Sequence, residues 1–359
     1  MQGREGKRMA KQTIRLKDIS EKSGYSVSTV SKALLGKADI GEETREQVIS
    51  IARAMGYKPN SMARYLRLGQ TNLIGIIIPD NRNPYYSLIL KEIENIARQH
   101  GYITIIMNAD EEKKLEQTVL NTLLSLSVDG IIAVPAYLEN YADVTVPTIF
   151  ISRFPYRPVA RKELINVEYE VNSEYSYVVN DDYYGQKLAA AHLMDTHGDN
   201  VYLMLGTNEG RCSSTIKDSI RLDGFYDALM ERMLPFDPDK VLWNSETIQS
   251  TYDSTLALCR RATPPFGICL YNDRVALGAI RAIHDSGLRI PQDVSVIGFD
   301  DLEFSPFCTP RLSTIRSAKF SMGSHAALQL IKILAQSTDD PQIVHTALQP
   351  DLIVRESSV

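Results

Sequence analysis

The first sixty residues carry the hydrophobic spacing of short amphipathic helices. In LKDISEKSG, Leu16 and Ile19 lie on one face, and Gly24 can end the helix because glycine adopts a left-handed conformation at low cost. Ser26 stands where an N-cap is favoured, since its hydroxyl can accept a hydrogen bond from a free backbone N–H. A second helix follows, with its apolar positions at Val30, Ala33 and Leu34. The pattern predicts two short helices joined by a tight turn.

A third helix is predicted over residues 41–56. Its apolar positions are Thr44, Val48, Ile51 and Met55, and Gly56 is the expected stop. Lys58 and Pro59 break the pattern, and Asn60 can cap a further segment that is too short to be a stable helix alone in water. We therefore expect a helical head at residues 13–57 and a hinge at residues 58–70.

From residue 73 onwards, apolar runs of strand length alternate with amphipathic helices. Buried parallel strands are predicted at residues 73–79, 102–109, 130–135 and 148–152, with helices at 85–100 and 115–126 between them. A second series begins near Tyr177, with strands at 201–206, 267–273 and 294–301. This alternation predicts two α/β lobes, each an open twisted sheet with ligand held at the carboxyl ends of its strands. The longer segment 154–180 is expected to be an inserted loop or hairpin near the junction, with or without a role in covering the cleft.

The second predicted helix has an outward face rich in hydrogen-bond donors and methyl groups: Val27, Ser28, Thr29 and Lys32. Such a face suits base edges in a DNA major groove, which admits a helix. An ordinary corner between two helices is the alternative for this stretch. Charge favours DNA: residues 1–70 hold 14 Lys or Arg against 7 Asp or Glu, whereas the remaining chain holds 25 against 37. A basic head on an acidic body is typical of phosphate attraction confined to one end.

Other classes of protein find little support in the chain. The four cysteines, Cys212, Cys259, Cys269 and Cys308, have no metal-binding spacing and are expected to be reduced thiols in a cytoplasmic protein. The first residues lack the apolar run of a signal peptide, and no stretch is long enough to span a bilayer, so no membrane partner is expected. The GTNEG turn lacks the spacing of a phosphate loop, and no catalytic motif is present. We expect neither enzymatic activity nor a cofactor.

Three long motifs resemble the LacI/GalR family of bacterial transcription regulators: SGYSVSTVSKAL, EETREQVISIARAMGYKPNSMAR and QTNLIGIIIPDNRNPYY. The resemblance implies a helix-turn-helix head, a hinge helix, and a core at residues 71–359 like a type I periplasmic sugar-binding protein. The core would cross three times between an N-subdomain (71–177 and 318–342) and a C-subdomain (178–317 and 343–359). Two residues depart from the family pattern: Arg15 replaces a capping Thr, which leaves Asp18 to favour the helix start, and Leu35 replaces a frequent Asn.

The resemblance also implies binding residues. In the hinge, Leu66 would wedge between base steps in the minor groove, and Arg64 and Arg67 beside it would meet phosphates; packing of Leu66 on the head is the alternative. Asn60, at the start of the same segment, is a further predicted DNA-binding residue. In the core, Asn83, Tyr85 and Tyr86 follow the first strand and Ser152 and Arg153 follow the strand at 148–152, so they are candidates by position. The resemblance implies effector contacts for Arg221, Asn272 and Asp300. The predicted effector-binding residues are Asn83, Tyr85, Ser152, Arg221, Asn272 and Asp300. Asn272 and Asp300 could instead cap the elements that follow them, and Arg221 could form a surface ion pair.

We therefore expect a cytoplasmic, ligand-responsive and sequence-specific DNA-binding regulator. The resemblance implies a repressor of carbohydrate-metabolism genes, with a small-molecule effector, most commonly a sugar in this family, that controls hinge folding. It would bind a palindromic operator as a homodimer, because one small head reads only a half-site. The alternative is a sugar- or nucleobase-binding module without regulatory DNA binding.

Overall fold

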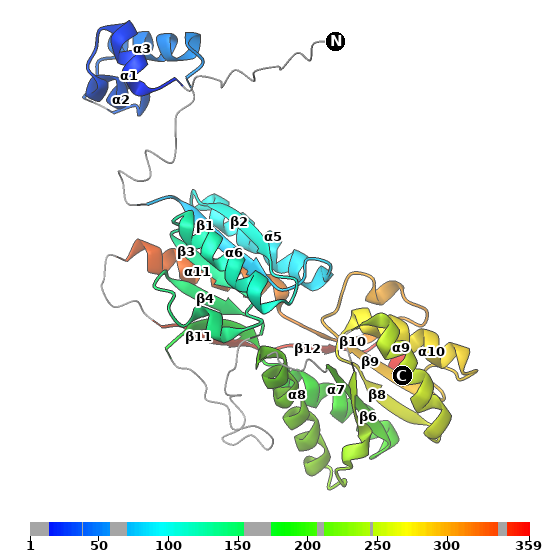
Figure 1. The fold of residues 1–359 in the computed structure, drawn as a ribbon. Coiled ribbons are helices and arrows are strands. Elements are labelled where there is room, and N and C mark those ends of the chain that lie inside the picture. Colours follow the sequence, from blue (N-terminus) through cyan, green and yellow to red (C-terminus); the bar gives the residue numbers. More distant parts are fainter. Residues whose placement is uncertain are drawn as a thin grey trace, which may run out of the picture. The chain divides into compact units, whose positions relative to one another are not determined.

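The computed structural model describes residues 14–37, 39–57, 70–153, 174–206, 212–244, 247–336 and 343–359, with the side chains of residues 212–219 left out. The chain divides into two compact units, Met1–Gln70 and Thr71–Val359. Figure 1 shows the fold of both units, coloured along the sequence from the N-terminus to the C-terminus. Among the described residues, no helix combines the length and apolar character that crossing a bilayer requires.

The head is formed by three helices: α1 (Leu16–Ser23), α2 (Val27–Leu34) and α3 (Glu42–Ala54). Its buried core consists of Ile19, Val30, Ala33, Val48 and Ala52. Gly24 ends α1 in the left-handed conformation (φ 75°), and the hydroxyl of Ser26 accepts the Thr29 N–H over 3.1 Å. Both turn signals are confirmed. At the start of α1, the Asp18 carboxylate accepts the backbone N–H of Arg15 over 2.7 Å, which compensates for the missing capping Thr.

The second unit begins with a six-stranded, wholly parallel sheet in the order β11-β5-β4-β3-β1-β2. Its strands are β1 (Leu73–Ile78), β2 (Ile103–Asn108), β3 (Gly130–Ala133), β4 (Thr148–Ile151), β5 (Ser176–Asn180) and β11 (His345–Leu348). One face packs on α5 (Pro84–Gln99) and α11 (Lys319–Ala335), and the other packs on α6 (Lys113–Ser125) and the short η1 (Leu138–Tyr141). This layered body is the N-subdomain.

The C-subdomain contains the other sheet, in the order β12-β10-β9-β8-β6-β7. Its strands are β6 (Val201–Gly206), β7 (Val241–Asn244), β8 (Phe266–Cys269), β9 (Val294–Phe299), β10 (Ser313–Arg316) and the antiparallel β12 (Asp351–Ile353). Helices α7 (Asp182–His197) and α8 (Cys212–Glu231) cover one face, while α9 (Ile248–Arg261) and α10 (Asp273–Asp285) cover the other, as Figure 1 shows. Short 3-10 turns complete it: η2 (Pro238–Lys240), η3 (Ser305–Phe307) and η4 (Glu356–Ser358).

The predicted subdomain bounds need correction at two crossings. Residues 176–180 form β5 and stay in the first sheet, because Val178 pairs with Ile151 of β4. The first crossing therefore follows Asn180 rather than residue 177. Residues 345–348 form β11 beside β5, so they also belong to the N-subdomain, and only β12 returns to the second sheet. The remaining crossing follows β10.

Two predicted strands also differ in character. Residues 102–109 were expected to be a buried strand, but β2 lies at the edge of its sheet, and Ile103 and Ile106 are 59% and 39% exposed. The apolar run alone does not reveal the order of strands. Residues 267–273 were expected to be one strand, but β8 ends at Cys269, because Asn272 already caps α10.

Candidate functional site

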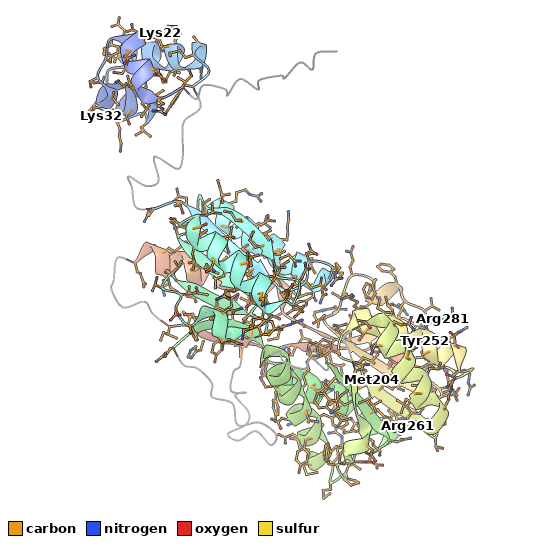
Figure 2. All side chains as sticks on the ribbon, in the orientation of Figure 1. Lys22, Lys32, Met204, Tyr252, Arg261 and Arg281 are labelled. Atoms are coloured by element: carbon orange, nitrogen blue, oxygen red, sulfur yellow. The ribbon has the colours of Figure 1, made fainter. Side chains whose placement is uncertain are left out.

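The outward face of α2 is accessible in the head. Val27 is 43% exposed, and Ser28 and Lys32 are also exposed. Thr29 is half-buried, and its hydroxyl lies 2.9 Å from that of Ser26. Figure 2 places Lys32 and Lys22 on opposite sides of the head. Three of the four predicted DNA-contacting residues are therefore open to a partner, and the fourth borders the helix cap.

Lys32 is not isolated on this face. Its ammonium group lies 2.5 Å from the Asp39 carboxylate, and about half of each side chain is exposed. The hydrogen bond from Lys32 holds the pKa of Asp39 below its usual value. The acidic partner thus competes with any phosphate or base edge for the Lys32 charge. The other predicted DNA-contacting residues, Asn60, Arg64 and Leu66, lie outside the described residues.

A cleft between the two subdomains brings most of the predicted effector-binding residues together. The N-subdomain contributes Asn83, Tyr85, Tyr86 and Arg153, and the C-subdomain contributes Arg221, Tyr271, Asn272 and Asp300. The space beside these residues amounts to about 260 Å³, a value that includes open solvent. Several of these residues follow the carboxyl ends of parallel strands, where open α/β sheets bind ligands. Of the six predicted residues, only Ser152 does not line the cleft.

The N-subdomain wall is organised around the Tyr85 hydroxyl. Asn180 donates to this oxygen over 3.2 Å, and Ser152 donates to it over 3.3 Å. Ser152 therefore supports Tyr85 from behind. Burial raises the pKa of Tyr85 well above its usual value, so the phenol stays neutral. Asn83 caps α5 by accepting the Tyr85 N–H over 3.1 Å.

Arg221 is the most deeply buried residue of the C-subdomain side of the cleft. Its side chain is only 1% exposed, and the guanidinium carbon lies 3.8 Å from the ring centroid of Phe299 and 5.0 Å from that of Tyr271. One Nη donates to the Tyr271 carbonyl over 2.6 Å, and Nε lies 3.4 Å from the Asp182 carboxylate. This burial rules out the alternative of a surface ion pair. The planar group is fixed by stacking and by its carboxylate partner.

Asn272 and Asp300 complete that wall. Asn272 caps α10 by accepting the Val275 N–H over 3.0 Å, so the capping alternative holds for it, at a position that also lines the cleft. Asp300 is 6% exposed and has φ 101°, a value that residues other than glycine rarely adopt. Ser317 donates to its carboxylate over 3.1 Å. Ser317 belongs to the segment that runs from β10 back to the N-subdomain, so this segment holds the carboxylate of a residue that lines the cleft.

Tyr86 and Arg153, which the strand-end rule had named as candidates beside Tyr85 and Ser152, also line the cleft. Tyr271 was missing from the prediction, although it directly precedes Asn272 and the same rule could have included it. Arg153 is bound at both oxygens of Glu111, at 2.7 and 2.8 Å, which the sequence could not show because the partner lies 42 positions away. Each arginine of the cleft thus has a carboxylate partner.

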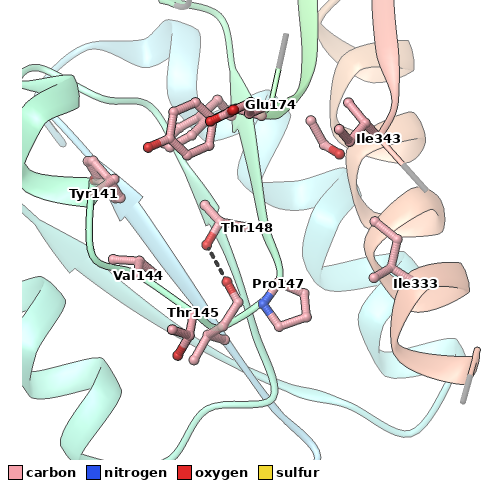
Figure 3. Close-up of a pocket in the computed structure, with 12 residues that line it drawn as sticks. Tyr141, Val144, Thr145, Pro147, Thr148, Glu174, Ile333 and Ile343 are labelled. Atoms are coloured by element: carbon pink, nitrogen blue, oxygen red, sulfur yellow. Dashed lines mark hydrogen bonds between the residues drawn. The ribbon is translucent and has the colours of Figure 1, made fainter. Parts of the chain in front are cut away.

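Another pocket lies in the N-subdomain and is larger, at about 640 Å³ including open solvent (Figure 3). It is bordered by residues that precede β4 and β5, by Tyr141, and by Ile333 and Ile343. Thr148 lines it while donating to the Val146 carbonyl over 2.9 Å. This pocket lies at the amino ends of the strands and its lining is mainly apolar. We favour the cleft as the ligand site because polar groups from both subdomains converge there.

No group of three or more His, Cys, Asp or Glu side chains is placed to hold a metal ion in the described part of the chain. The arrangement can do what a binding site does: it offers amide, guanidinium and carboxylate groups beside aromatic rings. Closure of the two walls on a ligand would change how the subdomains contact one another.

Comparison with known proteins gives one family match within each unit. Residues 15–60 match the family described as "Bacterial regulatory proteins, lacI family", and residues 190–358 match "Periplasmic binding protein-like domain". The chain is 29% identical over 331 residues to catabolite control protein A of Priestia megaterium, which covers 92% of this chain and 96% of that protein.

Two further similarities extend over nearly the whole chain. The HTH-type transcriptional repressor PurR of Pasteurella multocida (strain Pm70) is 27% identical over 344 residues, covering 95% of this chain and 98% of that one. The crystal structure of the lac repressor dimer bound to operator and the anti-inducer ONPF has a TM-score of 0.80 and 24% identity. It covers 97% of this chain and 100% of that one, and it supports the same fold.

Proposed function

Because the chain belongs to the lacI family of bacterial regulatory proteins, we propose that it is a cytoplasmic transcriptional repressor controlled by a small molecule. The single observation that carries this proposal is the cleft, where five effector-binding residues expected from the sequence converge in a chain that also carries a helix-turn-helix head. The head binds operator DNA, and the effector binds between the subdomains.

The proposed effector is a sugar. Both arginines of the cleft are paired with carboxylates, Arg153 with Glu111 and Arg221 with Asp182, so the described walls carry little unbalanced positive charge for a phosphate. Amide and carboxylate groups can bind hydroxyls, while Tyr86 and Tyr271 offer aromatic surface to a ring. Asn83, Tyr85, Arg221, Asn272 and Asp300 are the proposed contacts, with Ser152 supporting Tyr85.

Regulation would act through the hinge. We assign operator contacts to Val27, Ser28, Thr29 and Lys32 in the head and to Asn60, Arg64 and Leu66 in the hinge. Paired hinge segments from a homodimer would place Leu66 in the minor groove of a palindromic operator. The lac repressor relative is a dimer bound to operator, which supports this assembly. An effector that shifts the subdomains would then favour or melt the hinge.

The relatives described above are named as a repressor and a control protein, and we assign no reaction to this chain. The competing function is a ligand-binding module without regulatory DNA binding. It would account for the cleft but not for the exposed α2 face or the basic balance of residues 1–70.

The test uses the full chain. Operator sequences are selected from a random DNA pool, and affinity for the selected and a scrambled duplex is measured at fixed salt, because non-specific binding depends strongly on salt. D-ribose, glucose 6-phosphate and guanine are then screened by thermal shift, since a ligand that binds the native state raises the melting temperature. We expect a palindromic preference and a change in operator affinity with the stabilising compound. Equal affinity for both duplexes would leave only the binding module.

A further inference from the structure

Lys319 is a buried lysine that joins the two subdomains without lining the cleft. It begins α11, an N-subdomain helix, and is only 4% exposed. Its ammonium group donates to the backbone carbonyl of Asp300 and, over 3.3 Å, to that of Asp301. Both carbonyls belong to the C-subdomain loop that follows β9. A charged donor from one subdomain therefore holds the backbone that carries an effector-binding residue of the other.

The backbone of this loop needs such a partner. Asp300 and Asp301 have φ values of 101° and 50°, in the left-handed region that costs free energy for residues with a Cβ. The Asp301 carboxylate is held by Arg316 and Arg355, each at 2.7 Å. These two arginines fix the side chain, whereas Lys319 fixes the carbonyl groups. Loss of Lys319 would leave two backbone acceptors to relax.

The residues beside Lys319 join the same contact. Ser317 donates to the Asp300 carboxylate over 3.1 Å, and the Ala318 N–H donates to Asn180 over 2.9 Å. Asn180 in turn donates to the Tyr85 hydroxyl of the opposite wall. The residues at the start of α11 thus contact the Asp300 loop directly, and the side-chain amide of Asn180 links them to Tyr85 in the N-subdomain wall.

The Asp300 loop also enters the N-subdomain core. Leu302 is fully buried in the same apolar cluster as Ile78, Tyr85 and Met322. Its backbone N–H donates to Asp273 over 2.8 Å in the C-subdomain. A movement of this loop would therefore change contacts in both subdomains.

We propose that Lys319 is a positioning residue, which holds the Asp300 loop in the shape that presents its carboxylate to the effector and ties that loop to α11. The coupling role rests on the proposed function, because it assumes that the cleft binds the effector. The positioning role does not, since it concerns only the loop.

Hydrogen exchange of the full chain tests the positioning role without a ligand. The amides of Asp300 and Leu302 are hydrogen-bonded to Ile315 and Asp273, so they report on loop opening. In Lys319→Met they should exchange roughly tenfold faster, as expected for losing a charge-assisted hydrogen bond. Lys332→Met, an exposed change on the same helix, should leave them unchanged, and Lys319→Arg should restore much of the protection. Unchanged exchange at both amides in Lys319→Met would overturn the proposal. If that variant does not fold, Lys319→Gln is measured by the same criterion.

A double-mutant cycle tests the coupling role, with whichever of D-ribose, glucose 6-phosphate or guanine stabilises the wild type. If Lys319 acts through Asp300, Lys319→Met should weaken binding of that compound severalfold in the wild type but not further in Asp300→Ala. Additive losses would show that Lys319 does not act through Asp300. If none of the three compounds binds, the exchange result alone decides the role of Lys319.

Discussion

Arg274 at the start of α10 lies 3.7 Å from Asp80, which follows β1 in the opposite subdomain. Each residue is close to a cleft residue, Arg274 to Asn272 and Asp80 to Asn83. Asp80 also accepts two bonds from Arg82, and the hydrogen bonds from Arg82 help to keep its pKa low against the opposing effect of burial. The pair is a polar contact across the rim of the cleft.

Removing this contact should loosen closure. We expect Arg274→Ala to weaken effector binding by less than about 1 kcal/mol, because the arginine is partly exposed and its charge is screened by solvent. Titration calorimetry at low and high salt measures the effect, which should shrink at high salt. Arg281→Ala, farther along the same helix, is the control. Equal effects of the two substitutions would contradict a rim contact.

Arg221 should contribute to both binding and stability. Arg221→Ala removes the guanidinium that lies 3.4 Å from the buried Asp182 carboxylate, so we expect the unfolding free energy to fall by about 3 kcal/mol or more, along with loss of the effector response. Arg221→Lys keeps the charge but not the planar stack on Phe299, and it should lose the response at a smaller cost in stability. Chemical denaturation and thermal shift measure the two effects. Wild-type ligand shifts in the Lys variant would exclude a role for the planar group, and Arg260→Lys, at an exposed position of α9, is the control.

Substitutions of Lys32 and of Asp39 should change the affinity for DNA in opposite directions. Lys32→Ala should relax preference at one half-site position and cost roughly 1–3 kcal/mol of operator binding if Lys32 contacts a base. Asp39→Asn should instead tighten DNA binding, because it releases the Lys32 ammonium from its acidic partner. Binding to duplexes with single-position changes distinguishes base reading from phosphate contact: a uniform loss across all sequences would mean that Lys32 contacts only phosphate.

Leu66→Ala should uncouple the hinge from the operator. Unstacking a base step costs a few kcal/mol, which an apolar wedge must offset, so we expect weaker specific binding and a smaller DNA bend. Non-specific binding through the basic head should change little. Bend angle and operator affinity, each measured with and without effector, check this. If Leu66→Ala bends DNA as the wild type does and keeps the full effector response, the hinge only connects the head to the core.

Glu116 should make stability fall as pH rises. It is fully buried on α6, and burial raises its pKa from 4.5 to about 7 despite the N–H groups of Ala136 and Tyr137 that it accepts. Between these values the unfolded chain has lost the proton that the folded chain keeps. This acid therefore contributes a loss of stability from about pH 4.5 to about 7, and no further change above it.

Glu116→Gln cannot titrate, so its unfolding free energy should fall less than that of the wild type over this range, by up to about 3 kcal/mol. Asp273, whose pKa burial also raises to about 7, keeps part of the slope in both proteins. Urea denaturation at several pH values gives the comparison. Exposed Glu139, whose pKa a hydrogen bond from Lys113 lowers, is the control, because Glu139→Gln should shift the pH dependence in the opposite direction. Parallel profiles for wild type and Glu116→Gln would contradict a raised pKa.

Local signals predicted the parts of the fold that depend on neighbours in sequence. Gly24 and Ser26 act within one turn of their helices, and the residues that follow parallel strands reach the cleft because those strand ends share one edge. Long-range pairing was not predictable in this way. In the sheet that the described residues form, β2 is an edge strand because it pairs on one side only, with β1, and β5 belongs to the first sheet through its register with β4. The sequence did not point to Lys319, because its partners are the backbone carbonyls of Asp300 and Asp301 in the other subdomain.

The placement of β11 and β12 has a consequence for synthesis on the ribosome. β11 adds one of the two edge strands of the first sheet and β12 adds one of the two edge strands of the second, and both lie within residues 345–353. Neither sheet of the core can be completed until the ribosome has made that segment. The three helices of the head have no such dependence, because all their core residues precede residue 58. During translation the head can therefore fold while the core that would regulate it is still incomplete.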